Sequence, residues 1–122
     1  MKSKIALAFD KCRKAKRPAL ITYTVAGDNT KNNSIKILKK ISKHADILEL
    51  GFPHNTPIAD GGQIQGSSHR ALKNGIKLKD VFQIVKEFKK TNPNKPIILM
   101  GYFNLIYQNG ENNFLNSCKL SG

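Results

Sequence analysis

The sequence lacks the hydrophobic segments of a membrane or secreted protein. None of its apolar runs approaches the roughly 18 residues that a helix needs to span a bilayer. The first four residues lead into a segment that is broken by Asp10 and Lys11, with neither the apolar core nor the small-residue cleavage site of a secretory signal. We therefore expect a cytoplasmic protein.

Cysteine and histidine are too scarce and too scattered for a metal site or a disulfide framework. Cys12 and Cys118 are far apart, and each falls on the apolar stripe of an expected helix, which favours buried free thiols; a disulfide between them is possible but has no support. His44, His54 and His69 lie on separate segments, so we expect no metal ion. Glycine patterns of the Walker or dinucleotide-binding type are also missing.

Acidic residues are few, with 8 against 21 lysines and arginines, and the net charge is +13. Such a charge suggests nucleic-acid binding, because phosphate contacts come from lysine and arginine. The lysines, however, are spread over nearly every expected helix, and no aromatic residues interleave with them as a base-stacking platform requires. Solvated helix faces explain the charge better, and a small basic nucleic-acid-binding or scaffold module stays as the alternative function.

The hydrophobic pattern predicts helices that alternate with short apolar strands. We expect strands at 19–24, 47–50 and 97–102, a long loop at 51–62, and helices at 4–16, 31–44, 64–73, 81–88 and 111–119. Alternation of this kind implies a parallel sheet, and strands that are almost wholly apolar are typical of a sheet covered on both faces. A chain of 122 residues suits one small domain or part of a larger one.

Two carboxylates follow the second expected strand, in the segments Leu48–Pro53 and Pro57–Gly62. Glu49 alternates with Leu48 and Leu50, so it is expected to point away from the helices that these leucines contact. Side chains at the carboxyl ends of strands converge on one face of (β/α) proteins, and Glu49 and Asp60 should therefore meet at one edge. The ordinary alternatives are a solvent-exposed or lysine-paired glutamate and an Asp-Gly turn.

The segments Glu49–Pro53 and Ala59–Gln65 resemble the signature of the tryptophan synthase alpha chain family. In that family the strand ends in Leu-Glu-Leu-Gly, and the loop carries Pro-x-Ala-Asp-Gly before Ile-Gln. The resemblance covers essentially all of this chain but only the first half of the family's chain. It implies an α/β fold, the N-terminal part of a (β/α)8 TIM barrel of about 250 residues. Residues 1–122 would form one partial domain with an N-terminal helix and about three strand–helix units, a fragment truncated before the fourth strand.

The resemblance also implies an activity and the residues that perform it. The family is a carbon–oxygen lyase of the tryptophan synthase type, and it cleaves indole-3-glycerol phosphate to indole and glyceraldehyde 3-phosphate by a retro-aldol route. Glu49 matches the catalytic acid/base, and Asp60 matches the aspartate that holds the indole nitrogen. Tyr23, Met100 and Tyr102 are expected to bind the ring, because a flat apolar ring needs apolar walls. Another phosphate-handling (β/α) barrel enzyme is a further reading, and the isolated fragment is expected to be inactive.

The family's alpha chain needs no cofactor or metal, and its partner beta chain carries pyridoxal phosphate and consumes the indole in an alpha2-beta2 heterotetramer. The expected interface residues lie in the long loop and in a loop after the third strand: Pro53, Asn55, Thr56, Pro57 and Asn104. Two departures from the family occur here. His54-Asn55-Thr56 replaces Phe-Ser-Asp, and Gly62-Gln63 replaces Pro-Thr after Asp-Gly, which should loosen the loop. The phosphate-binding loops belong to the other half of the family's chain.

Overall fold

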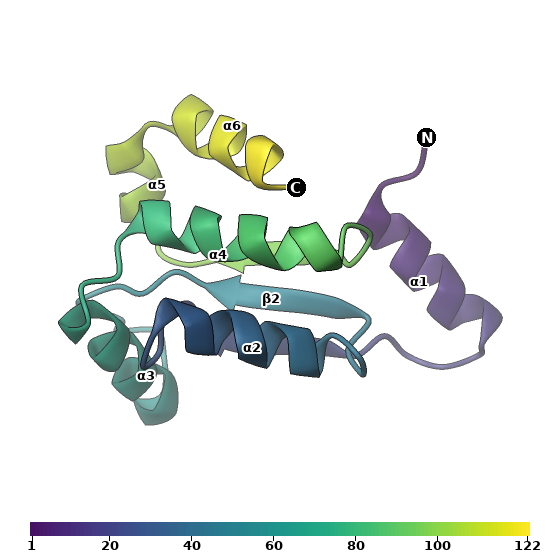
Figure 1. Ribbon diagram of the computed structural model, residues 1–122, viewed down its shortest axis with the longest axis horizontal. Coiled ribbons are helices and arrows are strands. Elements are labelled where there is room, and N and C mark those ends of the chain that lie inside the picture. The colour runs from purple at the N-terminus through teal and green to yellow at the C-terminus, as the bar shows by residue number, and fades with distance from the viewer.

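A parallel sheet of three strands forms the centre of the molecule, as the sequence predicts (Figure 1). The computed structural model describes all residues, 1–122. The strands are β1 (Ile21–Val25), β2 (Ile47–Gly51) and β3 (Ile97–Met100), in the order β1-β2-β3. In this register Tyr23 lies opposite Glu49, and Glu49 lies opposite Ile98. The three side chains therefore form one row across one face of the sheet.

The helices are distributed unevenly around this sheet (Figure 1). Helices α2 and α4 cover one face, and α6 lies beside α4. Helix α1 stands at the edge where the strands begin, and α3 and α5 lie at the edge where they end. None of these helices is long and apolar enough to cross a membrane. Their bounds are α1 (Lys4–Lys14), α2 (Lys31–Ile41), α3 (Gly62–Lys73), α4 (Leu78–Thr91), α5 (Phe103–Asn109) and α6 (Glu111–Ser121).

The hydrophobic core lies between the sheet and the helices α2 and α4. Leu48 and Leu50 of β2 are fully buried there with Leu38 of α2 and Phe88 of α4. Glu49, between the two leucines, is only partly buried. The alternation in the sequence thus predicted correctly which side chains of β2 meet the helices. Burying each such leucine or phenylalanine contributes about 1.5–3 kcal/mol.

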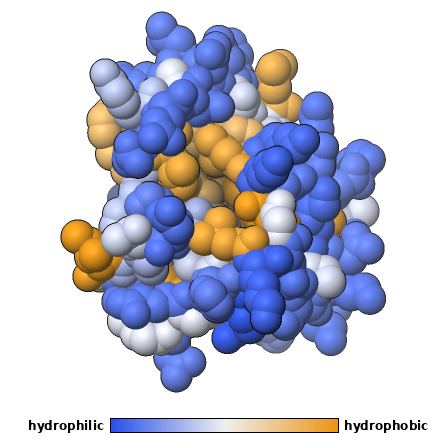
Figure 2. Space-filling view, turned by 90° about the vertical axis from the view of Figure 1, so that its left-hand side faces the viewer, coloured by the Kyte–Doolittle hydropathy of each residue, from blue (hydrophilic) through white to orange (hydrophobic).

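The opposite face of the sheet carries no layer of helices. Ile21 and Met100, on the outer strands of this face, are 42% and 43% exposed. Figure 2 looks at the end of the molecule that carries α3 and α5, and it shows apolar side chains gathered in a hollow among hydrophilic ones. The helices thus cover one face of the sheet only, as expected for the outer face of a partial barrel, and the face that a complete barrel would enclose is open.

Several element boundaries differ from those expected. Helix α1 ends at Lys14 because Lys16 adopts a left-handed conformation (φ 52°) before the chain turns at Pro18. Strands β1 and β3 are shorter than expected, and α6 extends to Ser121. Both cysteines are free; Cys12 is buried and Cys118 is partly buried, as their place on the apolar stripes predicted.

The prediction of a loop around Asn104 was wrong, because residues 103–109 form helix α5. The loop was implied by the resemblance of residues 100–104 to the family's third strand and its exit, and Asn104 and Asn109, as weak helix formers, do not themselves favour a helix. The helix forms nevertheless because Leu105 and Ile106 pack against the core cluster. Tertiary packing therefore outweighs the local preference here.

Candidate active site

Glu49 lies in the middle of β2 on the face away from α2 and α4. Its neighbours in the sheet are Tyr23 on β1 and Ile98 on β3. The six ion pairs of the chain all involve other carboxylates, so no lysine or arginine neutralises Glu49.

Tyr23 lies beside Glu49 in the sheet, and the charges of both carboxylates of the motif act on its hydroxyl. Burial, together with the nearby charges of Asp60 and Glu49, raises the pKa of Tyr23 to about 12. The hydroxyl therefore stays protonated at neutral pH. It lies directly over Gly51, where the Cβ of any other residue would overlap it. Glycine at this position leaves room for the Tyr23 ring above β2.

Asp60 is held in the loop after β2 by a residue that follows β3. The Tyr102 hydroxyl donates a hydrogen bond to Oδ2 of Asp60 (3.2 Å) and accepts one from the Ala59 N–H (2.9 Å). The side-chain amide of Gln65 donates to the Asp60 carbonyl (2.8 Å) at the start of α3. The His54 ring stacks on the Tyr102 ring, with centroids 4.8 Å apart. The loop is thus tied to the end of β3.

A hollow of about 330 Å³ opens beside these groups. Its lining joins the loop to the end of β3 and comprises Ala59, Asp60, Met100, Gly101, Tyr102 and Phe103. The structure therefore brings Asp60, Met100 and Tyr102 together around one hollow and places Glu49 and Tyr23 in the adjoining sheet. Asp60 is the one carboxylate that lines the hollow, whereas Glu49 and Tyr23 do not line it.

The expected interface residues are divided between the surface and the interior. Asn55 and Thr56 are exposed, and Pro57 is partly buried. Asn104 is exposed on α5 rather than on a loop. Pro53 is buried, so only the part of the long loop that follows Pro53 reaches the protein surface.

Three polar features of the site were missed by reading the sequence. Arg70 of α3 donates two hydrogen bonds to the Asp28 carboxylate, from Nε (2.7 Å) and from a terminal guanidinium nitrogen (2.8 Å). This guanidinium holds the pKa of Asp28 below its usual value, and the pair ties the loop after β1 to α3. The other two are the Tyr102 hydroxyl bond to Asp60 and the stacking of His54 on Tyr102. Each partner lies more than 40 residues away in the sequence, and no local signal predicts such pairs.

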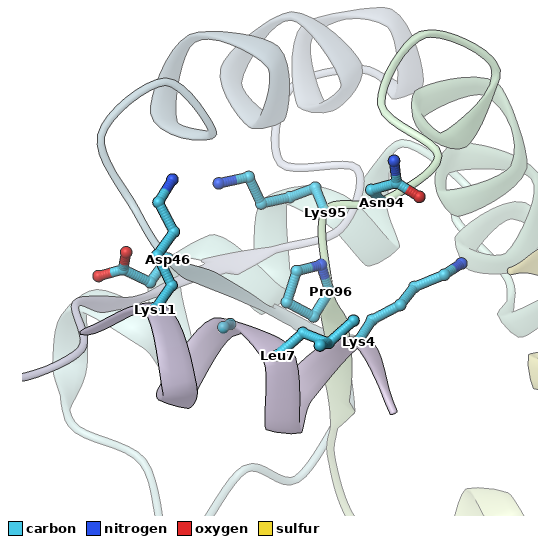
Figure 3. Close-up of a pocket in the computed structure, with 8 residues that line it drawn as sticks. Lys4, Leu7, Lys11, Asp46, Asn94, Lys95 and Pro96 are labelled. Carbon is cyan, nitrogen blue, oxygen red and sulfur yellow. The ribbon is translucent and has the colours of Figure 1, made fainter. Parts of the chain in front are cut away.

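A second hollow, of about 440 Å³, lies at the opposite edge of the sheet (Figure 3). Lys4, Leu7 and Lys11 line it from α1, and Asp46 and Lys95 line it from the segments that lead into β2 and β3. Three of its charged side chains, those of Asp46, Lys95 and Lys4, already have partners within the chain. Asp46 accepts two bonds from the Arg17 guanidinium (2.7 Å each), Lys95 Nζ donates to the Ala45 carbonyl (2.6 Å), and Lys4 Nζ donates to Gly122 O (3.3 Å). These contacts stabilise the edge of the sheet at which the strands begin.

Comparison with known proteins supports the family resemblance of the segments around Glu49 and Asp60. Residues 9–122 match the model of the family described as "Tryptophan synthase alpha chain". The chain belongs to this family. It is 69% identical over 120 residues to the tryptophan synthase alpha chain of Pelagibacter ubique, covering 98% of this chain and 45% of that relative. It is 48% identical over 104 residues to the alpha chain of Pyrococcus furiosus, covering 85% and 42%.

Solved structures show the same fold. The match to tryptophan synthase subunit alpha from Legionella pneumophila has a TM-score of 0.96 at 34% identity and covers all of this chain and 47% of that one. The match to the tryptophan synthase complex from Pyrococcus furiosus has a TM-score of 0.81 at 48% identity, covering 85% and 43%. The three strands and their helices correspond to the N-terminal part of the tryptophan synthase alpha TIM barrel, and the chain spans less than half the length of these relatives.

Proposed function

We propose that this chain supplies the acid/base part of a lyase site that cleaves indole-3-glycerol phosphate to indole and glyceraldehyde 3-phosphate, a step of tryptophan biosynthesis in the cytoplasm. The observation that carries the proposal is that Glu49 lies beside Tyr23 in the sheet and Asp60 lines the hollow at the end of β3, both at the positions of the family motif. The hollow beside Met100 and Tyr102 would receive the indole ring. The family match favours this lyase over the nucleic-acid-binding alternative.

In the proposed reaction the bond between the ring carbon and the glycerol side chain breaks. Glu49 gives a proton to that ring carbon and takes one from the hydroxyl on the adjacent side-chain carbon. The bonding electrons return to the ring as the hydroxyl carbon becomes an aldehyde. Asp60 accepts a hydrogen bond from the ring N–H and stabilises the positive charge that develops there. Two carboxylates with different surroundings can divide the chemistry in this way.

The alpha chain is proposed to work without a cofactor of its own and with a beta chain that carries pyridoxal phosphate. The relatives from Pyrococcus furiosus were crystallised as a tryptophan synthase complex and as the a2b2 complex. The exposed side chains of Asn55, Thr56 and Asn104 would contact such a partner, with Pro57 shaping the loop and buried Pro53 setting where it leaves the core.

The activity test requires the part of the barrel that this chain does not span. The chimera used for it joins residues 1–122 to the part of the Pelagibacter ubique alpha chain that follows its match to this chain, a relative with 69% identity. We expect the chimera to release indole and glyceraldehyde 3-phosphate from indole-3-glycerol phosphate in equal amounts. A folded chimera that binds the substrate but releases no indole would contradict the proposed function.

Asp60→Asn in the chimera should lower kcat by about 10-fold, the worth of a hydrogen bond to a charged group. The loss is limited because an amide oxygen still accepts the ring N–H bond, although it stabilises positive charge less well. Asp28→Asn is the control, because the Asp28 carboxylate pairs with Arg70 and holds a loop. Steady-state kinetics of the two variants separates a loss of chemistry from a loss of loop structure. A larger loss than that of a Glu49 variant would reverse the roles of the two carboxylates.

A further inference from the structure

The loop that carries Asp60 has few contacts of its own. Ile58 is 83% exposed, and Gly61 and Gly62 have no neighbouring atoms within 4 Å of where a Cβ would stand. A loop of this kind, which joins α3 through two successive glycines, samples many conformations unless another element fixes it. Placing a carboxylate for catalysis requires a geometry held within about 0.5 Å.

One side chain from outside the loop hydrogen-bonds to it at two successive residues. The Tyr102 hydroxyl receives the Ala59 N–H (2.9 Å) and gives its own proton to Oδ2 of Asp60 (3.2 Å). The three groups form a continuous chain of hydrogen bonds, in which each bond strengthens the next. Oδ1 of Asp60 accepts no hydrogen bond from the chain and stays available for a ring N–H.

Tyr102 is itself well fixed. It directly precedes α5, as the N-cap residue of that helix, and follows β3 by two positions. Its ring stacks on His54, which belongs to the same loop as Asp60, with an interplanar angle of 27°. The rigid end of β3 is thus connected to both ends of the loop, at His54 and at Ala59–Asp60.

We propose that Tyr102 is a positioning residue for the lyase reaction, which orients the Asp60 carboxylate through its hydroxyl in addition to lining the ring pocket. The proposal rests on the proposed function of Asp60. It assigns the Tyr102 hydroxyl a role that an apolar wall does not have, and it makes the effect of this hydroxyl depend on the presence of the Asp60 carboxylate.

A double-mutant cycle in the chimera tests this dependence. Tyr102→Phe keeps the ring and its stacking on His54 and removes only the hydroxyl. With Asp60 present we expect kcat to fall about 10-fold, since a hydrogen bond to a charged group is lost, with little change in KM. In the Asp60→Ala background the same substitution should change kcat by less than about 2-fold, because the group on which it acts is gone. Tyr107→Phe, on the 69% exposed Tyr107 of α5, is the matched control.

Equal fold losses in the two backgrounds would overturn the proposal and leave Tyr102 as a wall residue. A wild-type chimera without turnover would instead contradict the proposed function. The role of Tyr102 would then be judged from the hydrogen-exchange measurement alone. Hydrogen exchange of the Ala59 amide tests the contact independently of activity. Removal of its acceptor in Tyr102→Phe should speed this exchange by at least about 10-fold, and unchanged protection would show that the hydroxyl does not hold the loop.

Discussion

Glu49→Gln in the chimera is expected to lower kcat for indole release by about 10²–10⁴, the usual contribution of general acid–base catalysis. Glutamine keeps the shape of the side chain in the row between Tyr23 and Ile98, so the substrate should still bind. The amide cannot give a proton to the ring carbon or take one from the side-chain hydroxyl. The loss should therefore appear in kcat, with KM changed by only a small factor.

Glu87→Gln is the control for this substitution, because Glu87 lies on the outer helix α4 and forms an exposed pair with Lys90. It should leave kcat unchanged, since surface ion pairs contribute little to stability. Near-normal turnover in Glu49→Gln, with the control also active, would remove Glu49 from the mechanism.

Residues 1–122 by themselves are expected to aggregate or to form a molten state, with no measurable lyase activity. Strands β1 and β3 both leave an unpaired edge, and such edges promote association with other chains. The uncovered face exposes Ile21 and Met100, and Phe9 of α1 is 43% exposed. Supplying the rest of the Pelagibacter ubique chain as a separate polypeptide should restore both a cooperative melt and indole release, because it would pair the edges and cover this face.

Analytical ultracentrifugation and thermal melting followed by circular dichroism, with and without the second polypeptide, check this expectation. A matched mixture with an unrelated (β/α) barrel fragment controls for nonspecific solubilisation. A monomeric sample of residues 1–122 with a sharp cooperative melt would show that the open sheet is stable without the remainder of a barrel.

The sheet and the two carboxylates could be predicted from the sequence because their signals are local. Apolar runs of four to six residues mark the strands, and the alternation of Leu48, Glu49 and Leu50 shows which side chain faces away from the helices. The spacing from Glu49 to Asp60 belongs to one strand and the loop that follows it. Each of these features depends on residues that are close together in the chain.

The remaining features depend on contacts between distant residues. Helix α5 forms because Leu105 and Ile106 find the core, although Asn104 and Asn109 are weak helix formers. The bond between Tyr102 and Asp60 spans 42 residues, and so does the pair formed by Arg70 and Asp28. Sequence periodicity carries no information on such pairs, and the buried position of Pro53 likewise became clear only from the packed structure.

The most direct test of the lyase site is a crystal structure of the E49Q chimera with indole-3-glycerol phosphate bound, since this variant should bind the substrate without turning it over. The ring N–H should lie within hydrogen-bond distance of the Asp60 carboxylate, at about 2.7–3.2 Å, with residue 49 beside the ring carbon that carries the glycerol side chain. Met100 and Tyr102 should contact the ring faces. A ring bound elsewhere, with Asp60 turned to solvent, would contradict the assignment of this site.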